Sequence, residues 1–205
     1  MRTFFLWLIP VFLIALGITY AFTGPYVYPT SFALGPCFKD WTSLASYSDR
    51  VSPMDRVRFQ IDDANVQICY SRPSARGRVL FGTSEGLVRY GRLWRTGANE
   101  PTLLFTDTAL QVGDLTIPAG RYSLYTLPGS TTWDIHLNRS TFHWGNALTE
   151  DVLAQEIGRT TVATDSLPSY IEQFRIEPIG TGTDTALLLA WGNVGVRIPL
   201  AVAIP

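Results

Sequence analysis

Residues 57–71 read VRFQIDDANVQICYS. Apolar and polar side chains alternate along this stretch with a period of two, and Asp63-Ala64 interrupts the alternation once as a turn. Successive side chains of a strand point to opposite faces of a sheet, so this alternation predicts a β-hairpin with one buried face. The stretch favours a fold built from antiparallel strands.

The same period returns in the middle of the chain. Gly113-Asp114, a pair typical of two-residue hairpin turns, separates short apolar stretches at 110–112 and 115–117. Further alternation covers 122–127 and 133–137. Many short strands joined by glycine and proline turns predict an all-β fold, specifically an antiparallel β-sandwich or a jelly-roll-like barrel.

Two further strands are expected near the end of the chain. The unbroken apolar run at 186–190 is typical of a central strand that is covered on both faces. Gly192-Asn193 follows it, and we expect a turn there before a last strand at 194–200. The best helix candidate, 150–157, is short and equally compatible with a strand.

The amino-terminal part of the chain has a different character. No charged side chain occurs between Arg2 and Lys39, and residues 4–22 are almost wholly apolar. A helix of about 19 residues is roughly 28 Å long, close to the thickness of the hydrocarbon layer of a membrane. The predicted organisation is an anchor or signal segment at 1–22, a tether at 23–53 and an all-β domain at 54–205.

The apolar segment has two interpretations. A retained anchor with Arg2 in the cytoplasm places the domain in the cell envelope, membrane-anchored and extracytoplasmic, whereas a cleaved signal peptide would release it as a secreted protein. Both place the domain outside the cytoplasm. There, Cys37 and Cys69 are compatible with one disulfide between tether and sheet, or with two unpaired thiols.

Charge and motif content argue against several classes of function. The formal net charge is -1, whereas a nucleic-acid-binding surface usually needs a clear basic excess, so we expect no nucleic-acid partner. His136 and His143 are the only histidines, and no group of residues has metal-ligand spacing. Without a glycine-rich phosphate loop or a ligand cluster, the sequence predicts neither a cofactor nor a metal.

One stretch is similar to a catalytic motif. Residues 82–86 read GTSEG and fit the G-x-S-x-G nucleophile elbow, but an extended stretch follows where that motif needs a helix. An envelope hydrolase would have to use Glu100, Asp134 or His136 for acid-base chemistry. Because no nucleophile–base pair can be assembled, a binding module or a purely structural accessory subunit is favoured over an enzyme.

Two segments rich in arginine and aromatic residues, 70–78 and 90–100, are the strongest ligand-binding candidates. Guanidinium groups bind carboxylate or phosphate, and aromatic rings stack on sugars, so an anionic or carbohydrate-containing ligand, or an envelope protein, is expected. The structural alternative pairs Arg95 with Glu100 and buries Trp94 in the core. The candidate residues are Arg72, Arg76, Arg78, Trp94, Arg95, Asn99 and Glu100.

These segments also carry a resemblance to a bacterial family known as domain of unknown function 2911. Its motifs appear in order as YSRP (70–73), RGR (76–78), WRTGANE (94–100) and AGRYSL (119–124), and the match covers about 51–200. The resemblance implies a secreted or membrane-attached protein and supplies no catalytic residues. Residues 83–86 depart from the family pattern, and Arg89 stands where the family tends to have proline.

Overall fold

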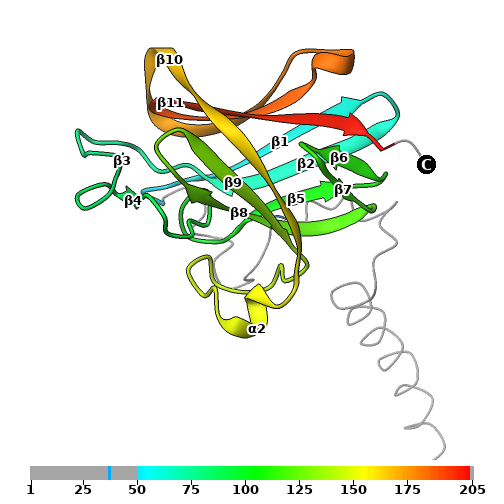
Figure 1. Ribbon diagram of the computed structural model, residues 1–205, viewed down its shortest axis with the longest axis horizontal. Coiled ribbons are helices and arrows are strands. Elements are labelled where there is room, and N and C mark those ends of the chain that lie inside the picture. The colour runs from blue at the N-terminus through cyan, green and yellow to red at the C-terminus, as the bar shows by residue number, and fades with distance from the viewer. Residues whose placement is uncertain (1–36, 38–49, 204–205) are drawn as a thin grey trace, which may run out of the picture.

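The structure is a computed structural model that describes Cys37 and residues 50–203 (Figure 1). The predicted anchor at 1–22, and the predicted tether apart from Cys37 and its last four residues, lie outside the described residues. Within the part of the chain that is described, no helix has both the length and the apolar character needed to cross a membrane.

Nearly all regular structure in the described residues is β-strand, so the all-β prediction is confirmed. Nine strands form one hydrogen-bonded sheet in the order β1-β2-β5-β8-β9-β10-β11-β6-β7, each pair antiparallel, and β3 and β4 form a separate parallel pair. Only α2 (Glu150–Leu153) and the 3-10 turn η3 (Gly182–Asp184) are helical there. The strands are β1 (Met54–Ile61), β2 (Ala64–Ser71), β3 (Phe81–Gly82), β4 (Val88–Arg89), β5 (Thr102–Thr106), β6 (Leu110–Val112), β7 (Leu115–Ile117), β8 (Gly120–Pro128), β9 (Thr132–Asn138), β10 (Glu156–Ile179) and β11 (Ala186–Val202).

Both hairpins predicted from alternation and turn residues are present. Strands β1 and β2 pair with Val57 opposite Ile68, and their turn lies one residue earlier than expected, with Asp62 at a φ of 51°. Strands β6 and β7 pair around Gly113, whose φ of 60° explains why glycine stands there. A period of two therefore identified strands whose inner face is buried.

The predicted turn at Gly192-Asn193 is wrong. Strand β11 runs without a break through both residues, and both of its halves pair with β10. Gly192 has a φ of 59°, and the pairing with β10 shifts register on either side of it. A glycine at positive φ serves a β-bulge as well as a turn, so the sequence signal was the same for both. The hairpin instead joins β10 to β11 through Gly180–Thr185.

Strand β10 connects the two parts of the sheet, because it pairs with a different strand along each part of its length. Its first part, Glu156–Ala163, pairs with β9, and the remainder, from Thr164 to Ile179, pairs with β11. Figure 1 shows β10 and β11 lying across β1 and β2, so that the sheet folds over on itself. Tyr70 of β2 bridges the two parts, because its ring meets Phe174 edge-on at 5.7 Å and its hydroxyl accepts a 2.9 Å hydrogen bond from the Ile176 amide.

The core lies between these two parts of the sheet. Strand β11 is buried from Ala186 to Trp191, as predicted for a strand covered on both faces. On the opposite face of β2 a smaller cluster forms around a disulfide between Cys37 and Cys69, whose Cα atoms are 5.6 Å apart. The disulfide attaches the chain at Cys37 to the outer face of the sheet. The largest fully buried side chains of the core include Ile68, Leu104, Leu124, Ile135, Trp133, Phe174, Ile176 and Trp191.

Candidate functional site

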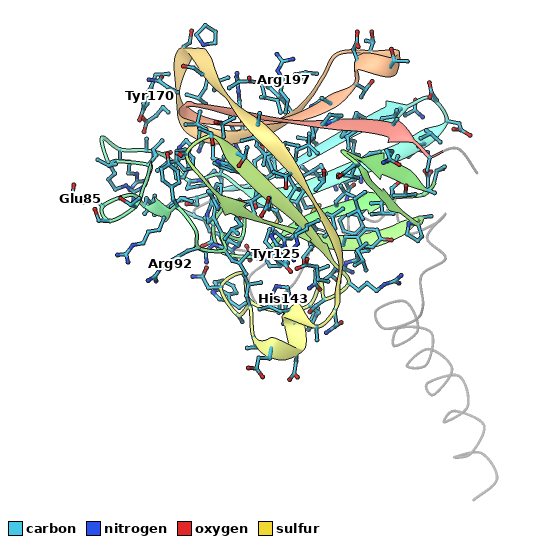
Figure 2. The ribbon with its side chains drawn as sticks, viewed as in Figure 1. Glu85, Arg92, Tyr125, His143, Tyr170 and Arg197 are labelled. Atoms are coloured by element: carbon cyan, nitrogen blue, oxygen red, sulfur yellow. A yellow bond between two sulfur atoms is a disulfide. The ribbon has the colours of Figure 1, made fainter. Side chains whose placement is uncertain are left out.

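A pocket of about 440 Å³ opens beside the β3–β4 pair. Most of its lining comes from three segments, 51–52, 73–78 and 87–98, and Asn146 and Trp191 complete it. Figure 2 shows Arg92, from the third segment, projecting outward at the end of the molecule that also carries the Glu85 loop. The lining residues are Val51, Ser52, Pro73, Arg76, Arg78, Leu87, Val88, Arg89, Arg92, Leu93, Trp94, Arg95, Gly97, Ala98, Asn146 and Trp191.

Five arginines line this pocket, namely Arg76, Arg78, Arg89, Arg92 and Arg95. No aspartate or glutamate lines it. Within the described part of the chain, the ion pairs involve other arginines, and none joins a carboxylate to any of these five guanidinium groups. We call this site the arginine pocket. It concentrates positive charge without an internal counter-charge.

Four of the predicted ligand residues line the arginine pocket: Arg76, Arg78, Trp94 and Arg95. Arg89 and Arg92 also line the pocket, although neither is among the ligand residues predicted from the sequence. Both arginines lie within the same short arginine-rich stretch that leads to Trp94. The spacing of arginines over residues 87–95 was the sequence signal that could have identified Arg89 and Arg92 as pocket residues.

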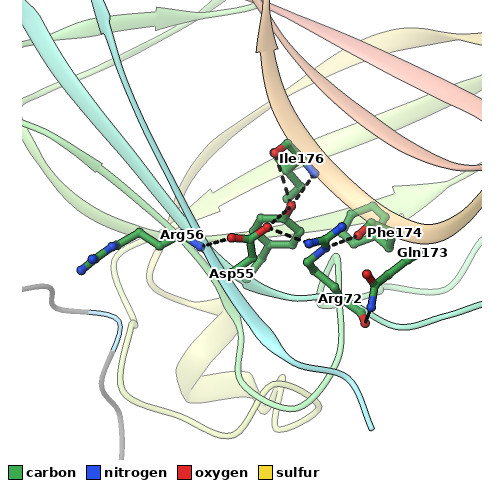
Figure 3. A network of polar contacts seen from close by, with 7 residues as sticks. Asp55, Arg56, Arg72, Gln173, Phe174 and Ile176 are labelled. Atoms are coloured by element: carbon green, nitrogen blue, oxygen red, sulfur yellow. Dashed lines mark hydrogen bonds and ion pairs between the residues drawn. The ribbon is translucent and has the colours of Figure 1, made fainter. Parts of the chain in front are cut away.

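Arg72 lies outside the pocket. Its guanidinium pairs with Asp55 of β1 at 3.2 Å, and its Nε donates to the Phe174 carbonyl oxygen at 3.4 Å (Figure 3). The Tyr70 hydroxyl lies 3.3 Å from the same Asp55 carboxylate. Burial raises the pKa of Tyr70 to about 12, so this phenol stays protonated. Arg72 therefore joins β1 and β2 to β10.

Glu100 and Asn99 do not line the pocket either. Glu100 is buried and is bound by Arg50, at 2.6 Å to Oε1 and 2.8 Å to Oε2. Asn99 donates from Nδ2 to the carbonyl oxygen of Ser52 at 3.2 Å. Among the described residues no ion pair joins Glu100 to Arg95, which was the structural alternative considered above. Both side chains hold the 50–52 segment in place as one wall of the pocket.

A strained turn positions Arg95. Thr96, the next residue, has a φ of 58°, an uncommon conformation for a β-branched residue that costs of order 1–3 kcal/mol. The turn is held because Thr96 Oγ1 donates to the Trp94 carbonyl oxygen at 3.2 Å and Thr102 Oγ1 donates to that of Thr96 at 2.6 Å. Gly145 packs against the Arg95 side chain so closely that a Cβ would collide with its Cδ atom at 2.5 Å. Arg95 is thus fixed from two sides.

Two of the five guanidinium groups are oriented by backbone carbonyls. Arg78 donates from Nε to Ala75 at 3.0 Å and from Nη2 to Ser74 at 2.7 Å. Arg95 donates from Nε to Gly97 at 3.4 Å, and its two terminal nitrogens donate to no acceptor among the described residues. Burial lowers the pKa of Arg95, and the charge of Glu100 opposes this effect. The half-buried Arg95 is a desolvated cation that an anion would stabilise.

Trp94 is part of the core rather than an open stacking surface. Its ring stacks on Trp191 with centroids 6.0 Å apart and planes 14° apart, and it meets Phe174 edge-on at 5.2 Å. Phe81 and Trp133 pack against it as well. The aromatic cluster therefore forms a rigid floor for the arginine pocket.

The other candidate acid-base groups lie elsewhere. On the outer face of β8 and β9, Glu156 Oε2 accepts a hydrogen bond from Tyr125 at 2.7 Å and lies 2.9 Å from His136 Nδ1. Asp134 accepts from Thr161 at 2.6 Å, and Ser84 lies in an exposed bend followed by β4, with no helix after it. Within the described residues, no group of histidine, cysteine and acidic side chains could hold a metal ion. None of these groups lines the arginine pocket.

The comparisons with known proteins agree with the ordered motifs. Residues 52–200 match the model of a family described as protein of unknown function (DUF2911). The matched region spans the folded-over sheet almost completely and contains all five arginines of the pocket. The searches of curated proteins and of solved structures gave no match. Since the family model covers most of the sequence, the chain belongs to the DUF2911 family.

Proposed function

We propose that this protein is a membrane-tethered, extracytoplasmic module that binds an anionic ligand in the arginine pocket. One observation carries the proposal: five guanidinium groups line one pocket, and no carboxylate lines it with them. Like charges held together repel one another, and a bound anion relieves that repulsion. The pocket volume of about 440 Å³ is within the usual range for a small-molecule site.

The geometry favours an anion over a neutral carbohydrate. Sugar binding through stacking needs an accessible aromatic face, but Trp191 stacks on one face of the half-buried Trp94 ring and Phe174 packs against it as well. Arg95, in contrast, presents terminal N–H groups at the pocket, and Arg78 is held in one orientation by two carbonyl oxygens. Guanidinium groups that are oriented in advance bind phosphate or carboxylate at a lower entropic cost.

The location is part of the proposal. The apolar segment at 4–22 would hold the chain at the membrane, and the disulfide between Cys37 and Cys69 fits an oxidising compartment. We also propose that the folded-over sheet is a β-sandwich, in which β10 and β11 cover the inner face of β1 and β2. The Tyr70–Phe174 contact between those strands supports this description.

The test is anion binding by the full chain in neutral maltoside micelles. Isothermal titration with inorganic phosphate and with citrate should show binding that weakens as the salt concentration rises. Arg95→Gln should weaken the binding at least tenfold. Arg197→Gln, which removes an exposed arginine paired with Asp165 outside the pocket, is the matched control and should bind like wild type. If neither anion binds, or if both variants behave alike, the proposal is wrong and a structural accessory role is favoured.

A further inference from the structure

Exposed aliphatic side chains form part of the rim of the arginine pocket, beside its exposed arginines. Val51, Leu87 and Leu93 line the pocket, and their exposed fractions are 70%, 47% and 36%. Val79, which is 58% exposed, continues this rim because its carbonyl oxygen accepts a 3.0 Å hydrogen bond from the Leu87 amide. Scattered exposed aliphatic residues need no explanation, but four that adjoin one cationic pocket do.

This arrangement suits an amphiphile. A free inorganic anion would use the guanidinium groups and leave the aliphatic rim in water. A molecule with an anionic head and an apolar chain would satisfy both surfaces at once. We propose that the ligand of the arginine pocket is a lipid with a phosphate-bearing headgroup, an inference that rests on the proposed anion-binding function.

Each part of the pocket then has a defined task. The phosphate lies against Arg78 and Arg95, whose guanidinium groups are held by backbone carbonyls. A phosphate offers several oxygen acceptors and up to two charges, which matches a cluster of guanidinium groups better than a single carboxylate does. Arg76, Arg89 and Arg92 are exposed and add attraction at longer range. The first methylene groups of the chain lie over Leu87 and Leu93.

The experiment compares phosphates that differ only in chain length. The full chain in maltoside micelles is titrated with methyl, butyl and hexyl phosphate, and micelles without protein supply the blank. Affinity should rise along the series, by at most about fourfold for each methylene that becomes fully buried. Leu87→Ser combined with Leu93→Ser should abolish the rise, so that this variant binds all three phosphates with one affinity. Phe142→Ser, which alters an exposed apolar residue outside the pocket, is the matched control.

The outcomes separate this inference from the proposed function. If all three phosphates bind with one affinity, the anion site stands and its ligand is a free phosphate compound, so the lipid inference is overturned. If the rise persists in the double serine variant, the chain binds elsewhere and the inference is also overturned. If none of the three binds, the proposed function fails with it.

Discussion

The Glu100 carboxylate accepts hydrogen bonds at 2.6 and 2.8 Å from a single nitrogen of Arg50, a residue 50 positions earlier in the chain. Both side chains are largely buried, with exposed fractions of 17% for Arg50 and 6% for Glu100. The Ser71 hydroxyl lies 3.4 Å from the same carboxylate. This pair fastens the segment that forms one pocket wall to the turn that carries Arg95.

Removing either partner of this pair should destabilise the protein. Glu100→Met or Arg50→Met removes one charge of a largely buried ion pair, at a cost of about 3–5 kcal/mol in the free energy of unfolding. Urea denaturation followed by tryptophan fluorescence measures the loss. Arg197→Met breaks an exposed pair with Asp165 and should cost no more than about 1 kcal/mol. The double variant Arg50→Met/Glu100→Met should be more stable than either single variant; losses that add would contradict the buried-pair account.

Replacement of Arg95 should separate stability from binding. Burial lowers the pKa of this arginine, and no ion pair compensates it among the described residues, so Arg95→Met removes a desolvated charge. The free energy of unfolding should stay within about 1 kcal/mol of wild type or rise. Phosphate binding should be lost in the same variant. A loss of stability as large as that of Glu100→Met would show instead that Arg95 holds the fold together.

The disulfide should contribute strongly to stability. Cys37 and Cys69 are 32 positions apart, and a cross-link of that span removes about 3–4 kcal/mol of chain entropy from the unfolded state. Cys37→Ser/Cys69→Ser should lower the unfolding free energy by this amount. Dithiothreitol should destabilise wild type equally and leave the double variant unaffected. Equal stability of wild type with and without reductant would contradict the prediction.

Protonation of the Glu156 carboxylate at low pH should destabilise the protein. Burial alone would raise the pKa of this carboxyl, but hydrogen bonds from Tyr125 and His136, with the charges of His136 and Arg159, bring it below the ordinary value of 4.5. Between the two pKa values the unfolded chain binds more protons, so this stabilisation is complete above about pH 5 and is lost as the pH falls through the folded pKa.

Urea midpoints measured between pH 6 and pH 3 test this dependence. Glu156→Gln should give a shallower fall in stability than wild type over that range. Glu85→Gln, which changes an exposed carboxylate on the loop at the end of the molecule, is the control and should follow wild type. A Glu156→Gln curve parallel to that of wild type would exclude this carboxyl as the source of the acid sensitivity.

Strand β10 shows what the sequence could not predict about the fold. The hairpins β1–β2 and β6–β7 were predictable because one face of each is buried, which imposes a period of two. Strand β10 has few buried residues, and their alternation is confined to two short stretches, at 160–162 and 174–176, which are too short to show one continuous strand. Its 24-residue extent follows from pairing with two different strands, and such distant partners leave no local signal. Gly192 was misassigned because a bulge and a turn need the same backbone conformation.

The sequence predicted the chemistry of the site, but it did not predict which residues line the pocket. The density of arginines pointed to an anion, and Arg76, Arg78, Trp94 and Arg95 do meet at one pocket. Whether an arginine faces a ligand or a carboxylate depends on the strand that passes beside it. Arg72 meets Asp55 across the β1–β2 pair, and Glu100 meets Arg50 from the segment that precedes β1. Neither partner can be identified from spacing alone.

The hydrogen bond from the Ile176 amide to the Tyr70 hydroxyl has a consequence for the timing of folding. The two residues are 106 positions apart, so the core cannot close until that length of chain has been synthesised. The arginine pocket forms later still, because Trp191 is part of its floor. A nascent chain that ends before β11 would expose its aromatic side chains and lack the floor of the arginine pocket. The arginine pocket therefore forms only after residue 191 has been synthesised, and truncations that remove β11 should not bind phosphate even when they leave every pocket arginine intact.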